Sequence, residues 1–213
     1  MNSDKTEQEI FWQGNFGDDY TERNKGDVFL AGKTVAFSMM LSRVSSISSA
    51  IEFGSNTGSN LIALKRIMPD LKISAIEINQ KASSILKHEY AKLYGSAVLV
   101  YNQSILKWDI DYKRDLAFTC GVLIHIGPNS LQCAYQKLYD ASCKYILIAE
   151  YFNTTPVEVL YRGHSGKLFK RDYCGEMLDK FSDLKLRDYG FFYQRDITHH
   201  KVMDDITWFL LEK

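Results

Sequence analysis

From residue 50 onward, short apolar runs alternate with longer amphipathic segments, and this alternation restricts the fold more than any other feature of the sequence. AIEF at residues 50–53 is typical of a strand, and a predicted helix from Gly58 to Met68 follows it and ends at Pro69. Strands that alternate with helices form a parallel sheet that is covered by helices on both faces. The sequence therefore predicts an α/β fold.

The alternation continues through the middle of the chain and changes near its end. Further strands are predicted in LKISAIE, SAVLVY, DLAFTCGVL and KYILIAEY, and further helices at residues 79–93 and 128–142. The last two β-rich runs, LKLRDYGFFYQRD and DDITWFLLEK, are separated by a polar turn, with no helix between them. Strands joined in this way pair as an antiparallel hairpin. We therefore expect a mixed sheet of seven strands.

The N-terminal region has a different pattern. Its first segment is polar with interleaved aromatic residues, which indicates short helical pieces, and residues 27–43 predict one longer helix. We expect a helical cap over residues 1–49 and a core over residues 50–213, which together form a single domain.

Composition excludes several classes of function. The 26 basic and 26 acidic residues cancel and no dense basic run occurs, which argues against a nucleic-acid partner. No apolar stretch approaches the ~18 residues of a membrane span, and no signal peptide or C-x-x-C pair is present. We expect a cytoplasmic protein without a membrane partner, and four buried, reduced cysteines. No metal site is expected, because no nearby Cys or acid completes a zinc set with His199 and His200.

The stretch EFGSNTG, at residues 52–58, ends the first strand of the alternating region and precedes a helix. Gly54 and Gly58 allow a tight turn and a close approach of a ligand to the backbone, and the helix offers unpaired N–H groups. Glu77 ends the next strand about 20 residues later, where an acid can accept hydrogen bonds from both hydroxyls of a ribose. These features indicate a nucleoside site. The alternative is a purely structural turn, with Glu77 capping the following helix.

Two kinds of nucleoside cofactor fit such a site, a dinucleotide and S-adenosylmethionine. The G-x-x-x-G spacing around Ser55, Asn56 and Thr57 differs from the G-x-G-x-x-G of dinucleotide sites. Glu52, two residues before the first glycine, would repel a pyrophosphate and favours a cation, such as an ammonium held through water. S-adenosylmethionine is therefore favoured, and a nucleotide-dependent oxidoreductase is the weaker alternative.

These motifs resemble those of the class I S-adenosylmethionine-dependent methyltransferases over nearly the whole chain. IEFGSNTG resembles their first motif with Asn56 in place of the central glycine, Glu77 matches the acid after the second strand, and DLAFTCGVLIHI resembles the segment that lines the reacting methyl group. FWQGNFGDDYTERN, GVLIHI and YRGHSGKLFKRDYCGEMLDK further resemble methyltransferases associated with pseudaminic acid biosynthesis. The resemblance implies a Rossmann-like class I methyltransferase fold, S-adenosyl-L-methionine as cofactor and S-adenosyl-L-homocysteine as product.

The resemblance also implies a set of cofactor-binding residues. N-terminal aromatic side chains would fold over the cofactor, and Arg23 would pair with its methionine carboxylate. Packing of these aromatic side chains on the sheet is the alternative. The expected set is Trp12, Tyr20, Arg23, Glu52, Gly54, Ser55, Asn56, Thr57, Gly58, Glu77, Ile78, Gln103, Ser104, Ile105, Thr119, Gly121 and Val122.

Two histidines are the candidate catalytic bases. His125 follows the fourth strand, where it could take the proton that methyl transfer to an amine or hydroxyl releases, and His164 is the second candidate. A packed histidine is the alternative for His125. The loop after the fifth strand supplies the predicted acceptor-binding residues Tyr151, Arg162, His164 and Arg171.

Clustered positive charge in that loop suits an anionic acceptor, and a solvated basic loop is the alternative. We therefore expect N- or O-methylation of a small sugar-derived acceptor in nonulosonic acid (pseudaminic or legionaminic type) or surface polysaccharide biosynthesis. The alternative function is a non-catalytic module that binds a nucleotide sugar or S-adenosylmethionine.

Overall fold

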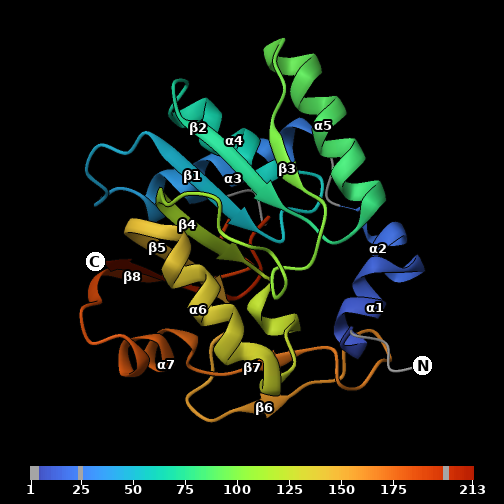
Figure 1. Cartoon of the computed structure of the whole chain (residues 1–213), viewed down its shortest axis with the longest axis vertical. Helices are drawn as coiled ribbons and strands as arrows, with labels where there is room; N and C mark the ends of the chain where they lie inside the picture. Colours follow the sequence, from blue (N-terminus) through green and yellow to red (C-terminus); the bar gives the residue numbers. More distant parts are fainter. Residues whose placement is uncertain (1–4, 24–25, 199–201) are drawn as a thin grey trace.

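The computed structural model describes residues 5–23, 26–198 and 202–213, and a seven-stranded sheet forms its centre (Figure 1). The strand order is β3-β2-β1-β4-β5-β9-β8, with β1 to β5 parallel and β9 antiparallel to both β5 and β8. This arrangement confirms the predicted mixed sheet and its C-terminal hairpin. The strands are β1 (Ser49–Phe53), β2 (Lys72–Ile76), β3 (Leu99–Tyr101), β4 (Arg114–Cys120), β5 (Ser142–Glu150), β8 (Lys185–Phe192) and β9 (Ile206–Glu212).

Helices cover both faces of the sheet because side chains alternate between the faces along each strand. In β4, Leu116 and Phe118 belong to the core under α3, α4 and α5, whereas Ala117 belongs to the core under α6 and α7. All three side chains are fully buried. The helices are α3 (Asp27–Met40), α4 (Ser59–Ile67), α5 (Gln80–Tyr94), α6 (Leu131–Ala141) and α7 (Tyr173–Lys180).

Two short helices at the N-terminus, α1 (Glu7–Gln13) and α2 (Asn15–Tyr20), lie past the carboxyl ends of β1 and β2 (Figure 1). Thr6 and Glu9 form a reciprocal capping box at the start of α1. Gly17 lets α2 pack on the end of α1, because a Cβ atom there would lie 1.9 Å from the Trp12 carbonyl oxygen. The structure therefore places these helices over the end of the sheet at which ligands of α/β proteins bind.

Several predicted boundaries and burial states were wrong. The first long helix ends at Met40 rather than at residue 43. The predicted helix at 128–142 is divided into a 3₁₀ turn (Pro128–Ser130) and α6. A small antiparallel sheet of β6 (Val157–Glu158) and β7 (Phe169–Lys170) was not predicted. Cys133, on the outer face of α6, and Cys143, near the start of β5, are exposed rather than buried.

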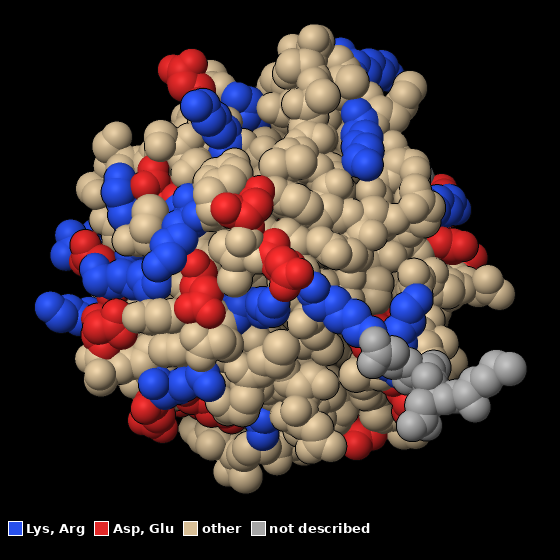
Figure 2. Space-filling model, in the orientation of Figure 1, with Lys and Arg blue, Asp and Glu red and all other residues tan. Residues whose placement is uncertain are grey.

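The two outer strands of the large sheet differ in length and shape. β3 has only three residues, whereas β8 has eight and carries a shift of pairing register between Leu186 and Asp188. Tyr189 and Phe191 on β8 are more than half exposed. Lysines and arginines lie beside aspartates and glutamates over the face shown in Figure 2. Within the described segments, no helix has the length and apolar character needed to cross a bilayer.

Candidate active site

A cavity lies at the carboxyl ends of β1, β2 and β4, between the sheet and the N-terminal helices. It brings together most of the residues that the sequence predicted for the cofactor, although they come from five separate segments of the chain. The predicted residues in its lining are Trp12, Tyr20, Arg23, Gly54, Ser55, Asn56, Thr57, Glu77, Ile78, Ser104, Ile105, Gly121 and Val122.

The loop after β1 needs backbone conformations that ordinary side chains rarely adopt. Gly54 has a φ of 75°, and a Cβ atom there would lie 2.7 Å from Val122. Asn56 has a φ of 47°, in the left-handed region that asparagine tolerates better than most residues. Asparagine can therefore replace the central glycine of the motif without forcing the loop into another path.

Glu77 holds this loop against the end of β2. Its carboxylate accepts hydrogen bonds from the Asn56 N–H (2.6 Å) and from the Asn79 N–H (2.7 Å). Burial raises the pKa of Glu77, and the backbone N–H groups oppose that shift. The cap of α5 is Asn79 itself, whose side chain accepts from the Ala82 N–H (2.8 Å). Glu77 lines the cavity, and each carboxylate oxygen retains acceptor capacity for a ligand hydroxyl.

Glu52 lies behind the loop and does not line the cavity. Asn60 Nδ2 donates to Glu52 Oε1 (2.6 Å), and Asn60 does line the cavity. The other oxygens of the pair, Glu52 Oε2 and Asn60 Oδ1, are buried without a hydrogen-bond partner among the described residues. Burial raises the pKa of Glu52 to about 8. Two unpaired acceptor oxygens at this depth fit a donor that carries positive charge.

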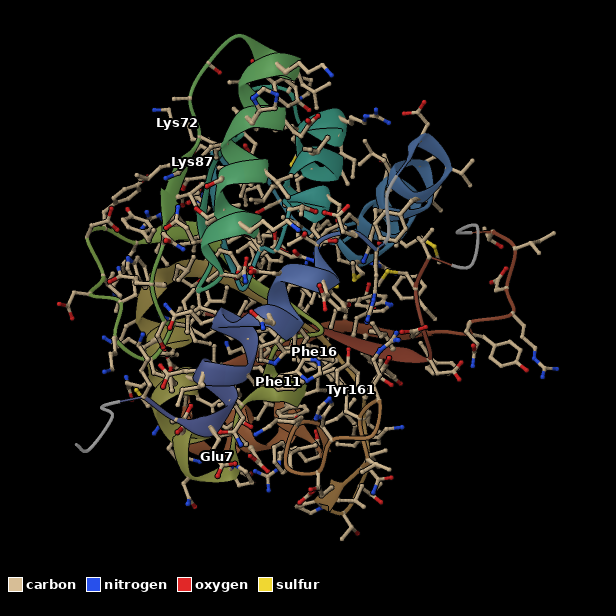
Figure 3. The ribbon with its side chains drawn as sticks, turned by 90° about the vertical axis from the view of Figure 1, so that its right-hand side faces the viewer. Glu7, Phe11, Phe16, Lys72, Lys87 and Tyr161 are labelled. Atoms are coloured by element: carbon tan, nitrogen blue, oxygen red, sulfur yellow. The ribbon has the colours of Figure 1, made fainter. Side chains whose placement is uncertain are left out.

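We call α1, α2 and residues 161–168 the lid, and its aromatic rings, including Phe11, Phe16 and Tyr161, form an aromatic wall (Figure 3). Two other rings of the lid, Trp12 and Tyr20, line the cavity. Phe11 and Phe16 stack with centroids 4.1 Å apart, and Phe16 lies 5.8 Å from Tyr161 of the later loop. Trp12 lies 4.6 Å from the ring of His125. The rings therefore pack on one another and on the later loop, and Trp12 also lines the cavity.

His125 lines the cavity from the 3₁₀ turn after β4 (Leu123–His125). Its Nδ1 lies 2.6 Å from the Lys167 carbonyl oxygen, which can only accept a hydrogen bond. The neutral ring therefore carries its proton on Nδ1 and leaves Nε2 free to accept one. Burial lowers the pKa of His125 to about 4, so the ring is neutral at pH 7 and is a weak base.

Glu150, at the end of β5, fixes the turn that carries His125. Its carboxylate accepts hydrogen bonds from the N–H groups of Val122, Leu123 and Ile124 at 3.0–3.3 Å. The side chain is almost fully buried, and burial raises its pKa to about 7. These N–H groups begin a 3₁₀ turn and have no partner within it, so the carboxylate supplies their acceptors.

Several other predicted residues lie outside the cavity lining. Gly58, with a φ of 83°, is the N-cap of α4, and a Cβ atom there would lie 2.1 Å from Leu86. Thr119 is buried in β4. Gln103 also lies outside the lining, whereas its neighbour Ser104 belongs to it.

The predicted acceptor-binding residues lie outside the cavity lining. His164 is exposed and lies against the rings of Phe11 (5.0 Å) and Phe16 (5.6 Å), and Arg162 is exposed. Arg171 Nε lies 3.2 Å from Glu176 Oε1. Tyr151 donates to Asp204 Oδ2 (2.7 Å). None of these four side chains lines the described cavity.

Sequence reasoning missed Lys33, Asn60 and Glu150. Lys33 is a buried charge within the apolar run DVFLAGKTVAF, and a single lysine on the apolar face of a helix was the available signal. Asn60 is in the first turn after the glycine motif, and Glu150 ends the strongly apolar fifth strand. In the described part of the chain, no group of three or more His, Cys, Asp or Glu residues could hold a metal ion. His199 and His200 lie outside the described residues.

The sheet order and the cavity define the fold as that of the class I methyltransferases, and comparison with solved structures agrees. Magnesium protoporphyrin IX methyltransferase from Synechocystis, solved with bound SAM, matches with a TM-score of 0.69 at 12% identity, and the match covers 100% of both chains.

The N-methyltransferase NodS from Bradyrhizobium japonicum, in complex with S-adenosyl-L-homocysteine, matches with a TM-score of 0.66 at 12% identity, over 92% of this chain and 97% of that one. The 1,6-didemethyltoxoflavin-N1-methyltransferase from Burkholderia thailandensis matches with a TM-score of 0.67 at 14% identity, over 93% of this chain and 82% of that one. No family model matches the chain, and a sequence search among curated proteins finds no relative.

Proposed function

We propose that the chain is an S-adenosylmethionine-dependent methyltransferase that methylates a nitrogen or oxygen of a small sugar-derived acceptor. The observation that carries the proposal is the pair of carboxylates at the glycine loop. Glu77 lines the cavity at the end of β2, and Glu52 with Asn60 presents two unpaired buried oxygens at the end of β1. Both fit the cofactor, with Glu77 at the ribose hydroxyls and the Glu52–Asn60 pair at the methionine ammonium.

The bound cofactor would supply an electrophilic methyl group on a positively charged sulfur. The protein would align the acceptor with that methyl group, exclude water with the aromatic wall and accept a proton at His125 Nε2. Because the pKa of His125 is about 4, its contribution is largest for an acceptor that loses its proton as the new bond forms. Trp12, which lies 4.6 Å from the His125 ring, would keep the ring in place.

The assignment to nonulosonic acid or surface polysaccharide biosynthesis rests on the sequence resemblance. The structural relatives named above act, by their names, on a porphyrin and on a toxoflavin precursor, and NodS is an N-methyltransferase. Their diversity leaves the acceptor of this chain to experiment. The neutral overall charge is in keeping with a small molecule rather than a nucleic acid. The candidate acceptor contacts Tyr151, Arg162, His164 and Arg171 lie outside the cavity lining.

The first test is cofactor binding by calorimetry. We expect S-adenosyl-L-homocysteine to bind with a Kd on the order of micromolar and NAD not to bind, because the G-x-x-x-G spacing differs from that of loops that hold a pyrophosphate. Tight binding of NAD without binding of S-adenosyl-L-homocysteine would contradict the proposal. A screen of sugar nucleotides and nonulosonic acids with methyl-labelled cofactor would then identify the acceptor. Cofactor binding without transfer to any of them would favour a non-catalytic module.

A further inference from the structure

Two positively charged side chains, Arg23 and Lys33, line the cavity from different elements. Lys33 comes from α3 and is only 8% exposed. Its ammonium contacts Met203 Sδ at 3.5 Å and lies 5.5 Å from the centre of the Phe29 ring. A thioether is a weak acceptor and an ammonium has three donors, so the described partners leave most of the hydrogen-bonding capacity of Lys33 unused.

Arg23 follows α2 and lies against two rings of the lid. Its guanidinium carbon lies 5.7 Å from the centre of the Phe16 ring and 5.3 Å from that of Tyr20. One of its nitrogens, Nη1, is buried without a hydrogen-bond partner among the described residues. Both cations therefore retain donors for an anion inside the same cavity.

The two cations act on different neighbours. Lys33 is the positive charge that lowers the pKa of Glu52, and it also acts on Cys120 at the end of β4. Arg23 and Arg162 lower the pKa of Tyr20, although burial raises it overall. Lys33 is one helical turn before Phe37, whose ring centre lies 5.6 Å from that of Phe118 in β4, so Lys33 lies at the β1–β4 end of the cavity. Arg23 lies on the side of the lid, against its aromatic rings.

An α-amino acid carries its ammonium and carboxylate on one carbon, so the protein groups that bind them must be neighbours. We propose that Lys33 binds the α-carboxylate of the cofactor beside the Glu52–Asn60 pair, and that Arg23 is left to bind an anionic group of the acceptor. This assignment rests on the proposed function. It differs from the role that the family resemblance implies for Arg23, because Lys33 lies on the side of the cavity formed by β1 and β4, whereas Arg23 packs on rings of the lid.

The first half of the proposal is tested with two ligands that differ only in the amino acid portion. S-adenosyl-L-homocysteine contains it and 5′-methylthioadenosine lacks it. We expect Lys33→Met to weaken binding of S-adenosyl-L-homocysteine by about 10-fold or more, the scale for losing a charged hydrogen bond, and to leave 5′-methylthioadenosine within about twofold. Arg23→Met should leave both affinities within about threefold.

The opposite pattern, with Arg23→Met weakening only S-adenosyl-L-homocysteine, would overturn the assignment. An unchanged affinity of Lys33→Met for S-adenosyl-L-homocysteine would also overturn the assignment. Retained binding of 5′-methylthioadenosine shows that each variant is folded. Lys87→Met and Arg66→Met, exposed positions on α5 and α4, are the matched controls. Failure of the wild-type protein to bind S-adenosyl-L-homocysteine would instead refute the proposed function, so the two failures are distinguishable.

The second half is tested on protein saturated with S-adenosyl-L-homocysteine, with N-acetylneuraminate and its uncharged methyl ester as probes. Ligand-observed NMR should show that the wild-type protein binds the acid about 10-fold or more tightly than the ester. Arg23→Met should remove this preference, whereas Arg66→Met should retain it. A wild-type protein without the preference, or an Arg23 variant that keeps it, would overturn the role of Arg23.

Discussion

The cavity has two sides, and they are built from different kinds of contact. On the motif side (residues 52–60 and 77–79), buried carboxylates hold backbone and amide N–H groups at 2.6–2.7 Å. On the lid side (α1, α2 and residues 161–168), aromatic rings pack at centroid distances of 4.1–6.2 Å, and Gln8 Nε2 donates to the Gly166 carbonyl oxygen (2.9 Å).

The difference shows which properties of the site are local. The motif side joins residues that are 8 and 21 positions apart, whereas Gln8 and Gly166 are 158 positions apart. Short hydrogen bonds to buried carboxylates fix the geometry of the motif side before a ligand arrives. Ring contacts tolerate small displacements, so the lid side can adjust to the acceptor. The predictions below test this division.

The largest expected effect is at His125, which contacts Trp12 and Lys167 of the lid side. His125→Ala should lower turnover by about 100-fold, because it removes a proton acceptor, and should leave the affinity for S-adenosyl-L-homocysteine within about twofold. Rates are measured with the acceptor found in the labelled-cofactor screen. His88→Ala, at an exposed position of α5, is the control. An unchanged rate would make His125 a packing residue.

On the motif side, Glu77→Ala should weaken binding of S-adenosyl-L-homocysteine by roughly 1–3 kcal/mol, since it removes hydrogen bonds to a charged group. The Asn56 and Asn79 N–H groups would also lose their acceptor. Calorimetry measures the loss, and Gln103→Ala, next to the cavity lining but outside it, serves as the control. Equal affinities of the two variants would refute the assignment of Glu77 to the ribose.

Glu150→Gln should lower the free energy of unfolding by about 1–3 kcal/mol, because three buried N–H groups would lose much of their acceptor. Turnover should fall more than cofactor affinity, since the displaced turn carries His125. Urea denaturation and steady-state kinetics measure the two effects. Asp70→Asn, at an exposed position, should change neither quantity. A variant with normal stability and turnover would remove Glu150 from the positioning of the turn.

A smaller effect concerns protons on the motif side. With a pKa of about 8, Glu52 is mostly protonated at pH 7 in the free protein. An incoming ammonium favours the carboxylate, so binding of S-adenosyl-L-homocysteine should release close to one proton at pH 7 and should strengthen as pH rises toward 8. Calorimetry in buffers of different ionisation enthalpy measures the release. Glu52→Gln should abolish it, and equal release from that variant would exclude Glu52 as the source.

The same raised pKa has a consequence for the stability of the free protein. Between the unfolded pKa of 4.5 and the folded pKa of about 8, the folded state binds more protons at Glu52 than the unfolded state does. The contribution of Glu52 to stability is therefore greatest at low pH and declines as pH rises through this range. Thermal unfolding of the wild type and of Glu52→Gln across this range should show a smaller decline in the variant.

The smallest expected effect is at the junction between the lid and the loop. Gln8→Ala removes the hydrogen bond to Gly166, while the exposed ion pair of Glu7 and Lys167 remains (3.3 Å). Such contacts contribute about 1 kcal/mol or less. Release of S-adenosyl-L-homocysteine should accelerate severalfold in stopped-flow experiments, with little change in the rate of methyl transfer. An unchanged release rate would show that the lid does not limit exit.

The motif side could be predicted from the sequence because its chemistry follows from residue types at short spacing. Gly54, Asn56 and Glu77, which the sequence predicts as cofactor contacts, all line the cavity. Their contact with a cofactor stays a prediction. Even the departure at Asn56 has a local explanation, since asparagine tolerates a φ of 47°. The strands could also be predicted from the sequence, because their apolar side chains recur at the period that a buried sheet requires.

The rest of the site was harder to predict from the sequence because it depends on contacts between distant segments. The basic residues after β5 are close together in sequence, but Arg171 pairs with Glu176 and Arg162 is exposed outside the cavity lining. Lys33 stands alone in an apolar helix and reaches the cavity only through the packing of α3. The carboxylate of Glu150 finds its N–H partners 26–28 residues earlier in the chain. The spacing of residues within one segment does not show which distant segments lie close together in the folded chain.

The outer strands of the sheet bear on how the molecule behaves at high concentration. A free strand edge is a template on which another chain can add a strand and begin aggregation. β3 offers only three residues for such pairing, and β8 interrupts its edge with the register shift between Leu186 and Asp188. Lys185 and Arg187 add charge to β8 beside the exposed rings of Tyr189 and Phe191. Both edges of the sheet that carries the cavity are therefore poor templates for fibril growth. β3 is too short to pair extensively, and β8 is irregular and charged.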